Sequence, residues 1–134
     1  MLRRYIYHKA RMQRTVPILH IGSYEEAKAY YVDWLGFEID WEFRFEPTFP
    51  VYMQVSRDGL VLHLSEHKGG NPGPAMCHVD VDDLDALMAE WKSRRPDFTQ
   101  EIEIAPWNAK HISLKDPFGN MLGINQDLTT PPET

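Results

Sequence analysis

The segment Pro106-Trp-Asn-Ala-Lys-His-Ile-Ser-Leu-Lys-Asp-Pro-Phe-Gly-Asn-Met-Leu-Gly-Ile-Asn125 decides the fold, because it contains the pattern of a complete β-hairpin. Residues 111–115 alternate polar and apolar side chains, which is typical of a half-buried strand. Residues 116–120 supply turn chemistry, because proline presets one φ and glycine or asparagine tolerates positive φ. Residues 121–125 resume the apolar alternation. The proline before Trp107 holds this large aromatic out of regular strand pairing.

A similar pattern occurs 60 residues upstream in the chain. Residues 57–64 fall opposite 117–124, residues 16–21 opposite 76–81, and residues 23–31 opposite 83–91. A single shift therefore aligns a strand, a helix and a closing hairpin. Such repetition indicates two copies of one βαβββ unit. We predict units at residues 15–67 and 75–126, joined by the Gly- and Pro-rich segment 68–74.

The local patterns place the individual elements within these units. In the first unit we expect strands at 15–21, 37–46, 51–55 and 60–64, and a helix from Ser23 to about Trp34 that ends at Gly36. In the second unit we expect strands at 75–81, 99–104, 108–115 and 119–126, and a helix over 83–93. The predicted fold class is therefore α+β. Tandem βαβββ units form a cupped eight-stranded sheet with two outer helices.

Both ends of the chain lie outside these units. Residues 1–14 form a basic N-terminal arm with five cations and no acid: Arg3, Arg4, Lys9, Arg11 and Arg14. We interpret the arm as a disordered or accessory segment. Contact with a membrane surface is one alternative, and translation that begins at Met12 is another. Residues 127–134, with two adjacent prolines, are predicted to be a disordered tail.

Composition excludes several classes of function. The 134 residues suffice for one domain with a real core. A single cysteine, Cys77, excludes an internal disulfide framework and favours a reducing, cytoplasmic location. The net charge of −6 argues against a nucleic acid partner and fits solubility or a cationic ligand. No apolar run reaches the roughly 20 residues of a membrane span, and no secretory signal is evident.

Strand alternation places polar residues on the face of the sheet that points away from the helices. The row Leu60, Leu62 and Leu64 should meet a helix, so the residues between them should face the other way. The same reasoning places Tyr52, Gln54, Asp80, Ser113 and four histidines on this inner face: His20, His63, His78 and His111. A polar inner surface on a curved sheet predicts a cup that binds small molecules.

Four histidines suggest two interpretations. They could ligate zinc, iron or nickel, or they could be hydrogen-bonding residues of the cup wall. Histidines scattered through the sequence favour the second interpretation. The sequence contains no H-x-x-E-H spacing, nucleophile elbow, Walker loop or dinucleotide fingerprint.

Four segments resemble the glyoxalase/bleomycin-resistance/extradiol-dioxygenase superfamily, also called the vicinal oxygen chelate superfamily. These segments are Val16-Pro-Ile-Leu19, Ala29-Tyr-Tyr-Val-Asp-Trp-Leu-Gly-Phe37, Leu84-Asp-Ala-Leu-Met-Ala-Glu-Trp91, and Pro106-Trp107 with Leu114-Lys-Asp-Pro-Phe-Gly-Asn120. The resemblance covers about residues 15–126. It is closest to the bleomycin resistance proteins, in which Pro-Trp precedes the penultimate strand.

The resemblance implies where a metal would be held. The metal-dependent members place ligands at four inward positions, which here are Val16, His63, Met76 and Gly123. Three of these cannot ligate a hard or borderline divalent ion, which argues against the metal-dependent mechanism. The resemblance to the resistance proteins implies instead no metal, no cofactor and no catalytic residue. It implies a homodimer that sequesters a drug without altering it.

A receptor for a flat cationic antibiotic needs aromatic faces and negative potential. The resemblance assigns ligand contacts to Trp107 and Trp41, although Trp41 could also pack in the core. The remaining candidate ligand-binding residues are Phe49, Tyr52, His63 and His111. The main alternative is a glyoxalase- or dioxygenase-type enzyme that uses a metal on His63 with His20, His78 or His111. Another is a sensor or carrier for an unrelated metabolite.

Overall fold

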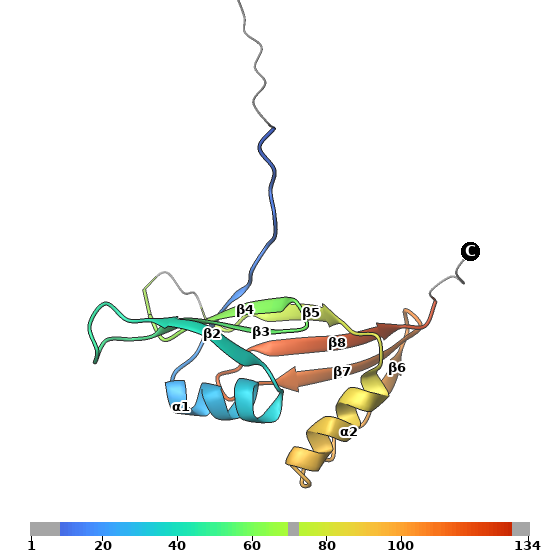
Figure 1. The fold of residues 1–134 in the computed structure, drawn as a ribbon. Coiled ribbons are helices and arrows are strands. Elements are labelled where there is room, and N and C mark those ends of the chain that lie inside the picture. Colours follow the sequence, from blue (N-terminus) through green and yellow to red (C-terminus); the bar gives the residue numbers. More distant parts are fainter. Residues whose placement is uncertain (1–8, 70–72, 130–134) are drawn as a thin grey trace, which may run out of the picture.

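The computed structural model describes residues 9–69 and 73–129, and its elements follow the order βαβββ twice (Figure 1). The first unit contains β1 (Ile18–His20), α1 (Tyr24–Ala27), its π-helical continuation η1 (Lys28–Trp34), β2 (Glu38–Phe43), β3 (Tyr52–Arg57) and β4 (Leu60–Ser65). The second contains β5 (Met76–Asp80), α2 (Leu84–Arg94), β6 (Glu103–Ala105), β7 (Ala109–Lys115) and β8 (Met121–Asp127). The predicted α+β class and tandem units are confirmed. No helix in the described ranges is long and apolar enough to span a membrane.

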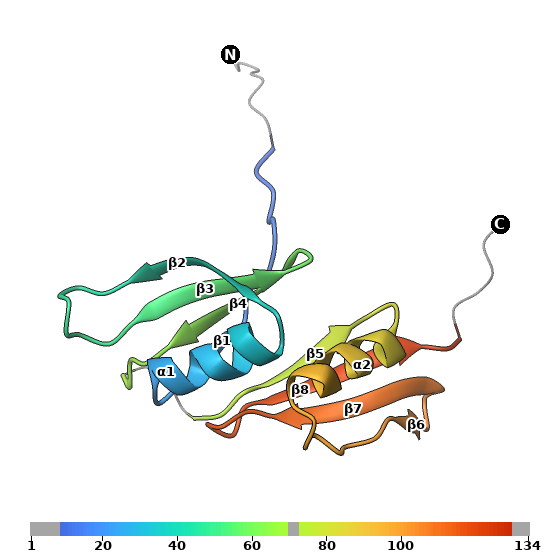
Figure 2. The same ribbon diagram turned by 60° about the horizontal axis from the view of Figure 1, so that its bottom comes forward.

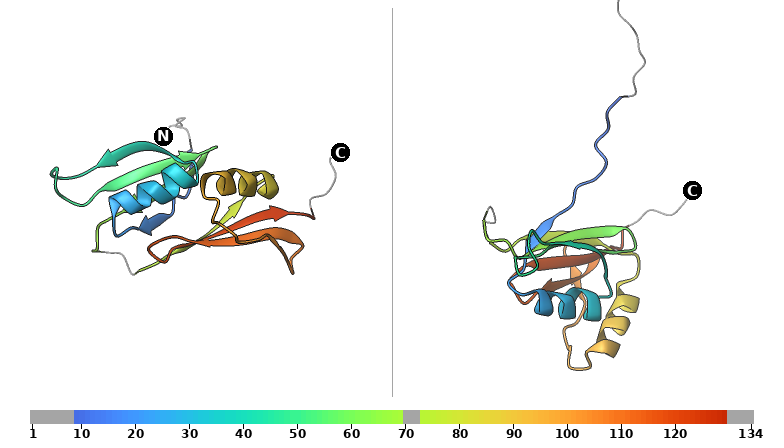
Figure 3. Two further views of the ribbon diagram at one scale, coloured as in Figure 1. Left: turned by 90° about the horizontal axis from the view of Figure 1, so that it is seen from below. Right: turned by 60° about the vertical axis from the view of Figure 1, so that its left-hand side comes forward.

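The eight strands form two four-stranded sheets, in the orders β1-β4-β3-β2 and β5-β8-β7-β6. In each sheet the first strand of the unit pairs in parallel with the last. Ile18 lies opposite His63 in the first sheet, and His78 lies opposite Gly123 in the second. Each residue of the second pair is 60 positions after its counterpart in the first, as the repeat predicts. Figures 2 and 3 show one helix packed on each sheet, and Figure 1 shows both helices on the same side of the molecule. The opposite face of each sheet is the inner face described below.

The first strand is shorter than predicted because of Pro17. Its carbonyl accepts a hydrogen bond from the His63 amide (3.0 Å), but proline has no N–H to extend the ladder further. At the equivalent position of the second unit Cys77 retains its N–H, and β5 begins at Met76, two residues earlier in the repeat than the start of β1 at Ile18. Residues 9–15 precede Pro17 as an exposed segment that extends away from the body (Figure 1).

The core lies between each sheet and its helix. Ser23 caps the first helix by accepting a hydrogen bond from the Glu26 amide (3.2 Å). Gly36 ends this helix at φ +88°, a left-handed conformation that favours glycine. Alternate residues of β4, Leu62 and Leu64, are buried beneath the helix, as the alternation predicted.

Strand β2 departs from the predicted alternation. Ile39 pairs with Val55 and Trp41 with Gln54, so Asp40 is an extra residue in a β-bulge. The bulge changes the phase of the strand. Ile39 packs against the core, whereas Trp41 is 42% exposed. The interpretation of Trp41 as a core residue is therefore wrong.

Other boundaries also differ. The predicted strand 99–104 is reduced to β6, because the Gln100 side chain, rather than a backbone group, donates to the Ser113 carbonyl (2.7 Å). Asp127 belongs to β8 rather than to the tail. Parts of the predicted arm, linker and tail (1–8, 70–72 and 130–134) lie outside the described residues.

The turn of the last hairpin connects the two units. The buried Asp116 carboxylate accepts hydrogen bonds from the Tyr31 hydroxyl (2.6 Å) and from the Asn120 side chain (2.9 Å) through Oδ2. Its Oδ1 accepts from the backbone amides of Phe118 (2.9 Å) and Asn120 (2.7 Å). The Asn120 side-chain Nδ2 also donates to the His20 carbonyl of β1 (2.7 Å). One carboxylate therefore orders the turn and joins it to the first helix.

We expect Asp116→Ala to lower the free energy of unfolding by about 3–5 kcal/mol, because four donors lose their acceptor in a buried place. Tyr31→Phe is the matched control. It removes one of the four donors and should cost about 1–2 kcal/mol. Urea denaturation of the three proteins measures both values. Equal losses for the two variants would contradict this account of the turn.

Candidate functional site

Three of the predicted site residues lie together on the inner face of the first sheet. Trp41 of β2 stacks on Tyr52 of β3, with ring centroids 6.0 Å apart and planes inclined by 14°. His63 of β4 contacts both rings edge-on, at 5.3 Å from Trp41 and 5.2 Å from Tyr52. We call these three residues the aromatic cluster. It presents two nearly parallel rings on an open sheet face.

A chain of hydrogen bonds holds the aromatic cluster in place. The Tyr52 hydroxyl lies 2.8 Å from His63 Nδ1, and His63 Nε2 lies 3.0 Å from Gln54 Oε1. The Gln54 amide nitrogen in turn donates to Asp40 (3.0 Å), as does the Ser56 hydroxyl (3.0 Å). Since Gln54 donates to Asp40, its oxygen accepts from His63 Nε2–H, which leaves Nδ1 to accept from Tyr52. The bulge at Asp40 makes this chain possible.

The same surroundings keep His63 neutral. Burial lowers the pKa of its imidazole, and the nearby Arg14 cation lowers it further. The pKa of Asp40 is lowered, whereas burial alone would raise the pKa of a carboxyl group. Hydrogen bonds from Gln54 and Ser56 lower the pKa of its carboxyl, so it is ionised at neutral pH. The site therefore contains a neutral imidazole and a negative charge on Asp40, with the Arg14 cation nearby.

We expect the imidazole of His63 to titrate with a midpoint below its ordinary value of 6.5 in the folded protein. Arg14→Ala should raise that midpoint, because it removes the nearby cation. A folded-state pKa below the unfolded value means that His63 contributes stability above about pH 6.5 and loses it as the pH falls. NMR titration of the ring protons, assigned with His63→Gln, measures both midpoints. A midpoint at or above 6.5, or one insensitive to Arg14→Ala, would contradict the assignment.

The second sheet carries a smaller group on its inner face. Trp107 lies in a turn closed by the hydrogen bond from the Asn108 amide to the Ala105 carbonyl (2.9 Å), and its side chain is 56% exposed. Its indole N–H donates to the buried side chain of Asn125 (2.8 Å). The ring meets His111 edge-on at 5.5 Å. This contact brings together two more of the predicted residues.

His111 is positioned by its own strand. Its Nε2 lies 3.1 Å from the Ser113 hydroxyl, and its buried Nδ1 has no hydrogen-bond partner among the described residues. The ring lies beside Gly123, where an added Cβ would come within 3.3 Å of His111 Cε1. A side chain at position 123 would therefore crowd this imidazole.

The remaining predicted residues lie elsewhere. Phe49 is in the loop between β2 and β3, where its carbonyl accepts from Arg44 (2.7 Å). His78 is exposed and pairs with Asp80 (2.7 Å), and His20 is at the end of β1. The structure thus gathers the six candidates into one group of three, one group of two, and Phe49 apart from both. Sequence reasoning placed Gln54 on the inner face but assigned it no role, and it missed Asp40 and Asn125 at the site.

The residues at the superfamily's metal positions do not fit a divalent ion. Val16 and Gly123 offer no ligand atom in their side chains, and the thioether of Met76 is a poor ligand for a hard or borderline divalent ion. Both ring nitrogens of the fourth, His63, are already engaged in hydrogen bonds. Within residues 9–69 and 73–129 there is no group of three or more His, Cys, Asp or Glu side chains that could hold a metal. The site therefore lacks the ligands that Lewis-acid catalysis would need.

We expect the purified protein to take up well under one equivalent of nickel, zinc or iron per chain, because the metal positions lack ligands. A chelator should leave the melting temperature unchanged, since no metal contributes to folding. Elemental analysis after dialysis against each metal, with a parallel melting curve in chelator, checks both statements. Stoichiometric metal that is lost in His63→Ala would favour the enzyme alternative.

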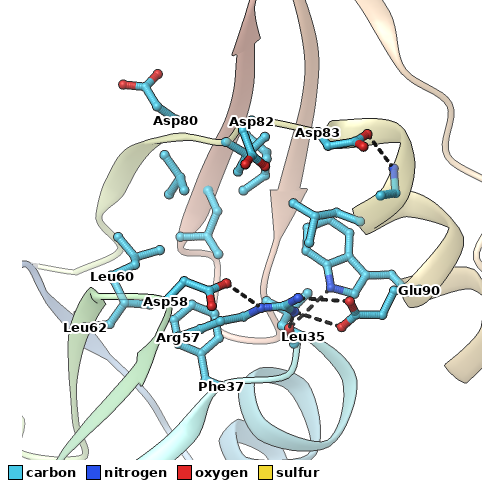
Figure 4. A pocket seen from close by; sticks show the side chains of 17 residues that line it. Leu35, Phe37, Arg57, Asp58, Leu60, Leu62, Asp80, Asp82, Asp83 and Glu90 are labelled. Atoms are coloured by element: carbon cyan, nitrogen blue, oxygen red, sulfur yellow. Dashed lines mark hydrogen bonds and ion pairs between the residues drawn. The ribbon is translucent and has the colours of Figure 1, made fainter.

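A cavity of about 530 Å³ lies on the other side of the molecule, between the two units and next to α2 (Figure 4). It is lined by residues of β4, β5, β8, α2 and the end of the first helix, and it includes none of the six candidate residues. The cavity is therefore distinct from the inner faces. The inner faces carry the two exposed tryptophans, Trp41 and Trp107.

Two comparisons place the chain among known proteins. A family model described as "Glyoxalase superfamily protein" matches residues 3–130. Among solved structures, a bleomycin resistance determinant encoded on the transposon Tn5 is 25% identical, with a TM-score of 0.69, over 87% of this chain and 99% of the other. A bleomycin-binding protein complexed with bleomycin is also 25% identical, with a TM-score of 0.66 over the same shares.

A superfamily member from Sphaerobacter thermophilus DSM 20745 is 19% identical, with a TM-score of 0.66, over 87% of this chain and 98% of the other. At that identity the likeness shows the fold alone. No match was found among curated proteins.

Proposed function

Because the chain belongs to the glyoxalase superfamily, we propose that it is a small-molecule-binding protein that sequesters a flat, cationic, aromatic antibiotic without chemical change. In this proposal the inner faces of the two sheets are the binding surfaces. Trp41, Tyr52 and His63 contact the ligand from the first sheet, and Trp107 and His111 from the second. The protein acts as a cytoplasmic homodimer. In the proposed dimer, the inner face of the first sheet of one copy lies opposite the inner face of the second sheet of its partner.

The aromatic cluster, in which an exposed Trp41 stacks on a hydrogen-bonded Tyr52, is the single observation that carries the proposal. Large aromatic rings are normally buried on folding, so a stacked Trp–Tyr pair on an open sheet face needs another explanation. The Tyr52–His63–Gln54–Asp40 chain fixes the rings before any ligand arrives. A pre-ordered surface loses little conformational entropy on binding, which favours a receptor for a planar molecule.

The charges on the first sheet favour a cation. Asp40 is ionised beside the aromatic cluster, and the same strand carries Glu38, whereas Glu42 accepts a hydrogen bond from Tyr24 of α1 (2.6 Å). Indole and phenol faces attract cations through their quadrupoles, and the adjacent carboxylates add long-range attraction. A flat cation therefore satisfies both the aromatic and the electrostatic properties of this surface.

The comparisons support the ligand class. Of the two 25% identical structures, one is complexed with bleomycin and the other is a resistance determinant against it. The enzyme alternative lacks comparable support from the site. His63, which would have to act as ligand or base, has both nitrogens engaged. We therefore favour binding over catalysis.

We expect Trp107→Ala and Trp41→Ala each to weaken binding of bleomycin by about 1–3 kcal/mol, the range for losing one aromatic stack. Both rings are substantially exposed, so melting temperatures should change little. Isothermal titration with bleomycin, and with ethidium as a second flat cation, measures the affinities.

Two further variants act as controls for this prediction. Trp107→Phe keeps an aromatic ring and should retain most of the affinity, whereas Phe49→Ala, in the β2–β3 loop, tests the one candidate apart from both groups. Wild-type affinity in both tryptophan variants would show that neither ring contacts the ligand. Failure of the wild-type protein to bind either probe would contradict the proposed ligand class.

A further inference from the structure

The cavity between the two units has an aliphatic floor. The floor side chains come from β4, β8 and the end of β5: Leu60, Leu62, Val79, Val81, Leu122 and Ile124. The two aromatic residues of the lining, Phe37 and Trp91, are 7% and 4% exposed, so neither offers an open ring face. The cavity volume of about 530 Å³ lies within the range of roughly 300–1,000 Å³ that is usual for small-molecule sites. The floor therefore suits an aliphatic group rather than a flat ring.

The rim of this cavity is acidic. Five of its lining residues are acids: Asp58, Asp80, Asp82, Asp83 and Glu90. Figure 4 shows Asp80, Asp82 and Asp83 along the upper edge. The one cation among the described lining residues, Arg57, donates to both carboxylate oxygens of Glu90 (2.8 and 2.9 Å). Since this guanidinium is already paired, the rim carries an excess of negative charge. We call this cavity the acidic cleft.

Asp82 is the rim acid that is most available to a ligand. The other three aspartates are engaged: Asp58 with Arg57 (3.4 Å), Asp80 with His78 (2.7 Å) and Asp83 with the backbone amide of Ala86 (3.0 Å). Asp82 is exposed and makes no hydrogen bond or ion pair with any residue in the ranges 9–69 and 73–129. A cationic group at the rim would give this carboxylate a partner.

We propose that the acidic cleft is a second ligand site, which binds a linear aliphatic amine as its ammonium ion. The alkyl chain lies on the floor, where its apolar surface is removed from water. The ammonium group stays at the rim beside Asp82, in contact with solvent, which avoids the cost of burying an unpaired charge. The acidic cleft contains none of the inner-face residues, so this proposal goes beyond the proposed function and does not rest on it.

Three ligands with the same alkyl chain and different head groups test the role of charge. We expect octylammonium to bind more tightly than 1-octanol, and octanoate to bind most weakly, because the head group lies among carboxylates. Isothermal titration of the full-length protein at low salt measures the three affinities. Added salt should weaken binding of octylammonium but not of 1-octanol, since salt screens only the charged contact. Octanoate that binds as tightly as octylammonium would overturn the proposal.

The length of the alkyl chain tests the role of the floor. From butylammonium to octylammonium, each added CH₂ group should tighten binding by about threefold to fourfold, the factor expected for burying one such group. An affinity that does not depend on chain length would mean that the floor makes no contact with the ligand, which would also overturn the proposal.

Two substitutions on α2 test the location of the site. Ala86 and Ala89 are both exposed on this helix, but only Ala86 lines the acidic cleft. Ala86→Leu should weaken octylammonium binding by about tenfold or more, the loss expected when roughly two CH₂ groups can no longer be buried. Ala89→Leu is the matched control and should leave the affinity unchanged. Leucine is a good helix former, so both variants should fold. Equal affinities in the two variants would show that the ligand binds elsewhere.

A second pair of variants tests the contact at the rim. Asp82→Asn should weaken octylammonium binding by about twofold to fivefold, which is the range for one solvent-exposed ion pair. It should not change the affinity for 1-octanol. The matched control is Asp97→Asn, which removes an exposed carboxylate outside the acidic cleft and should have no effect. Equal effects of the two variants would contradict the role of Asp82.

Competition with bleomycin separates this proposal from the proposed function. Saturating octylammonium should leave the bleomycin affinity unchanged, and Trp41→Ala should leave the octylammonium affinity unchanged. Competition between the two ligands would place octylammonium on the inner faces and refute the second site. A wild-type protein that does not bind octylammonium at millimolar concentration would refute only this proposal. Failure to bind bleomycin, with octylammonium still bound, would concern only the inner faces.

Discussion

The arrangement of the two units depends on the hydrogen bonds that the Arg57 guanidinium makes to both of them. It donates to the Leu35 carbonyl at the end of the first helix (2.6 Å) and to both carboxylate oxygens of Glu90 on α2. Arg94 adds a second bridge, to Glu90 and to the Trp34 carbonyl, at 2.7 Å each. The last carbonyls of a helix carry negative partial charge and have no partner within it, so two arginines satisfy them from outside. Arg57 also lowers the pKa of Glu90 through these hydrogen bonds.

This junction constrains the sequence around it. A Cβ at Gly36 would lie 2.7 Å from an Arg57 nitrogen, and the residue has φ +88°. Glycine is therefore needed both for the helix end and for the passage of the guanidinium. Trp34 and Trp91 pack beside it, and each indole donates to a carbonyl of the other unit. With the helices joined in this way, the orientation of each inner face follows from the packing of a sheet on its own helix.

The repeated frame could be predicted from sequence because turn residues and apolar alternation recur at a fixed shift. The inner-face positions of Tyr52 and His63 followed from the same alternation. Strand β2 does not keep this alternation, because the extra residue Asp40 turns the following side chains to the other face of the sheet. No residue type in the sequence predicts such a bulge. This one feature turned Trp41 from a core candidate into an exposed ring and placed Asp40 beside Gln54. The contact of Trp107 with Asn125 was also missed, because it joins a turn to a strand 18 residues away.

The pairing of Gly123 with His78 repeats that of His63 with Ile18, so positions 63 and 123 are structurally equivalent. The two units occupy equivalent frames, yet one holds an imidazole at this position and the other holds none. His111, from the neighbouring strand, lies where a Cβ at 123 would come within 3.3 Å. A histidine at 123 would therefore require His111 to move first. Placing a metal ligand at this position would need at least two coordinated substitutions, because the neighbouring strand already fills the space with an imidazole.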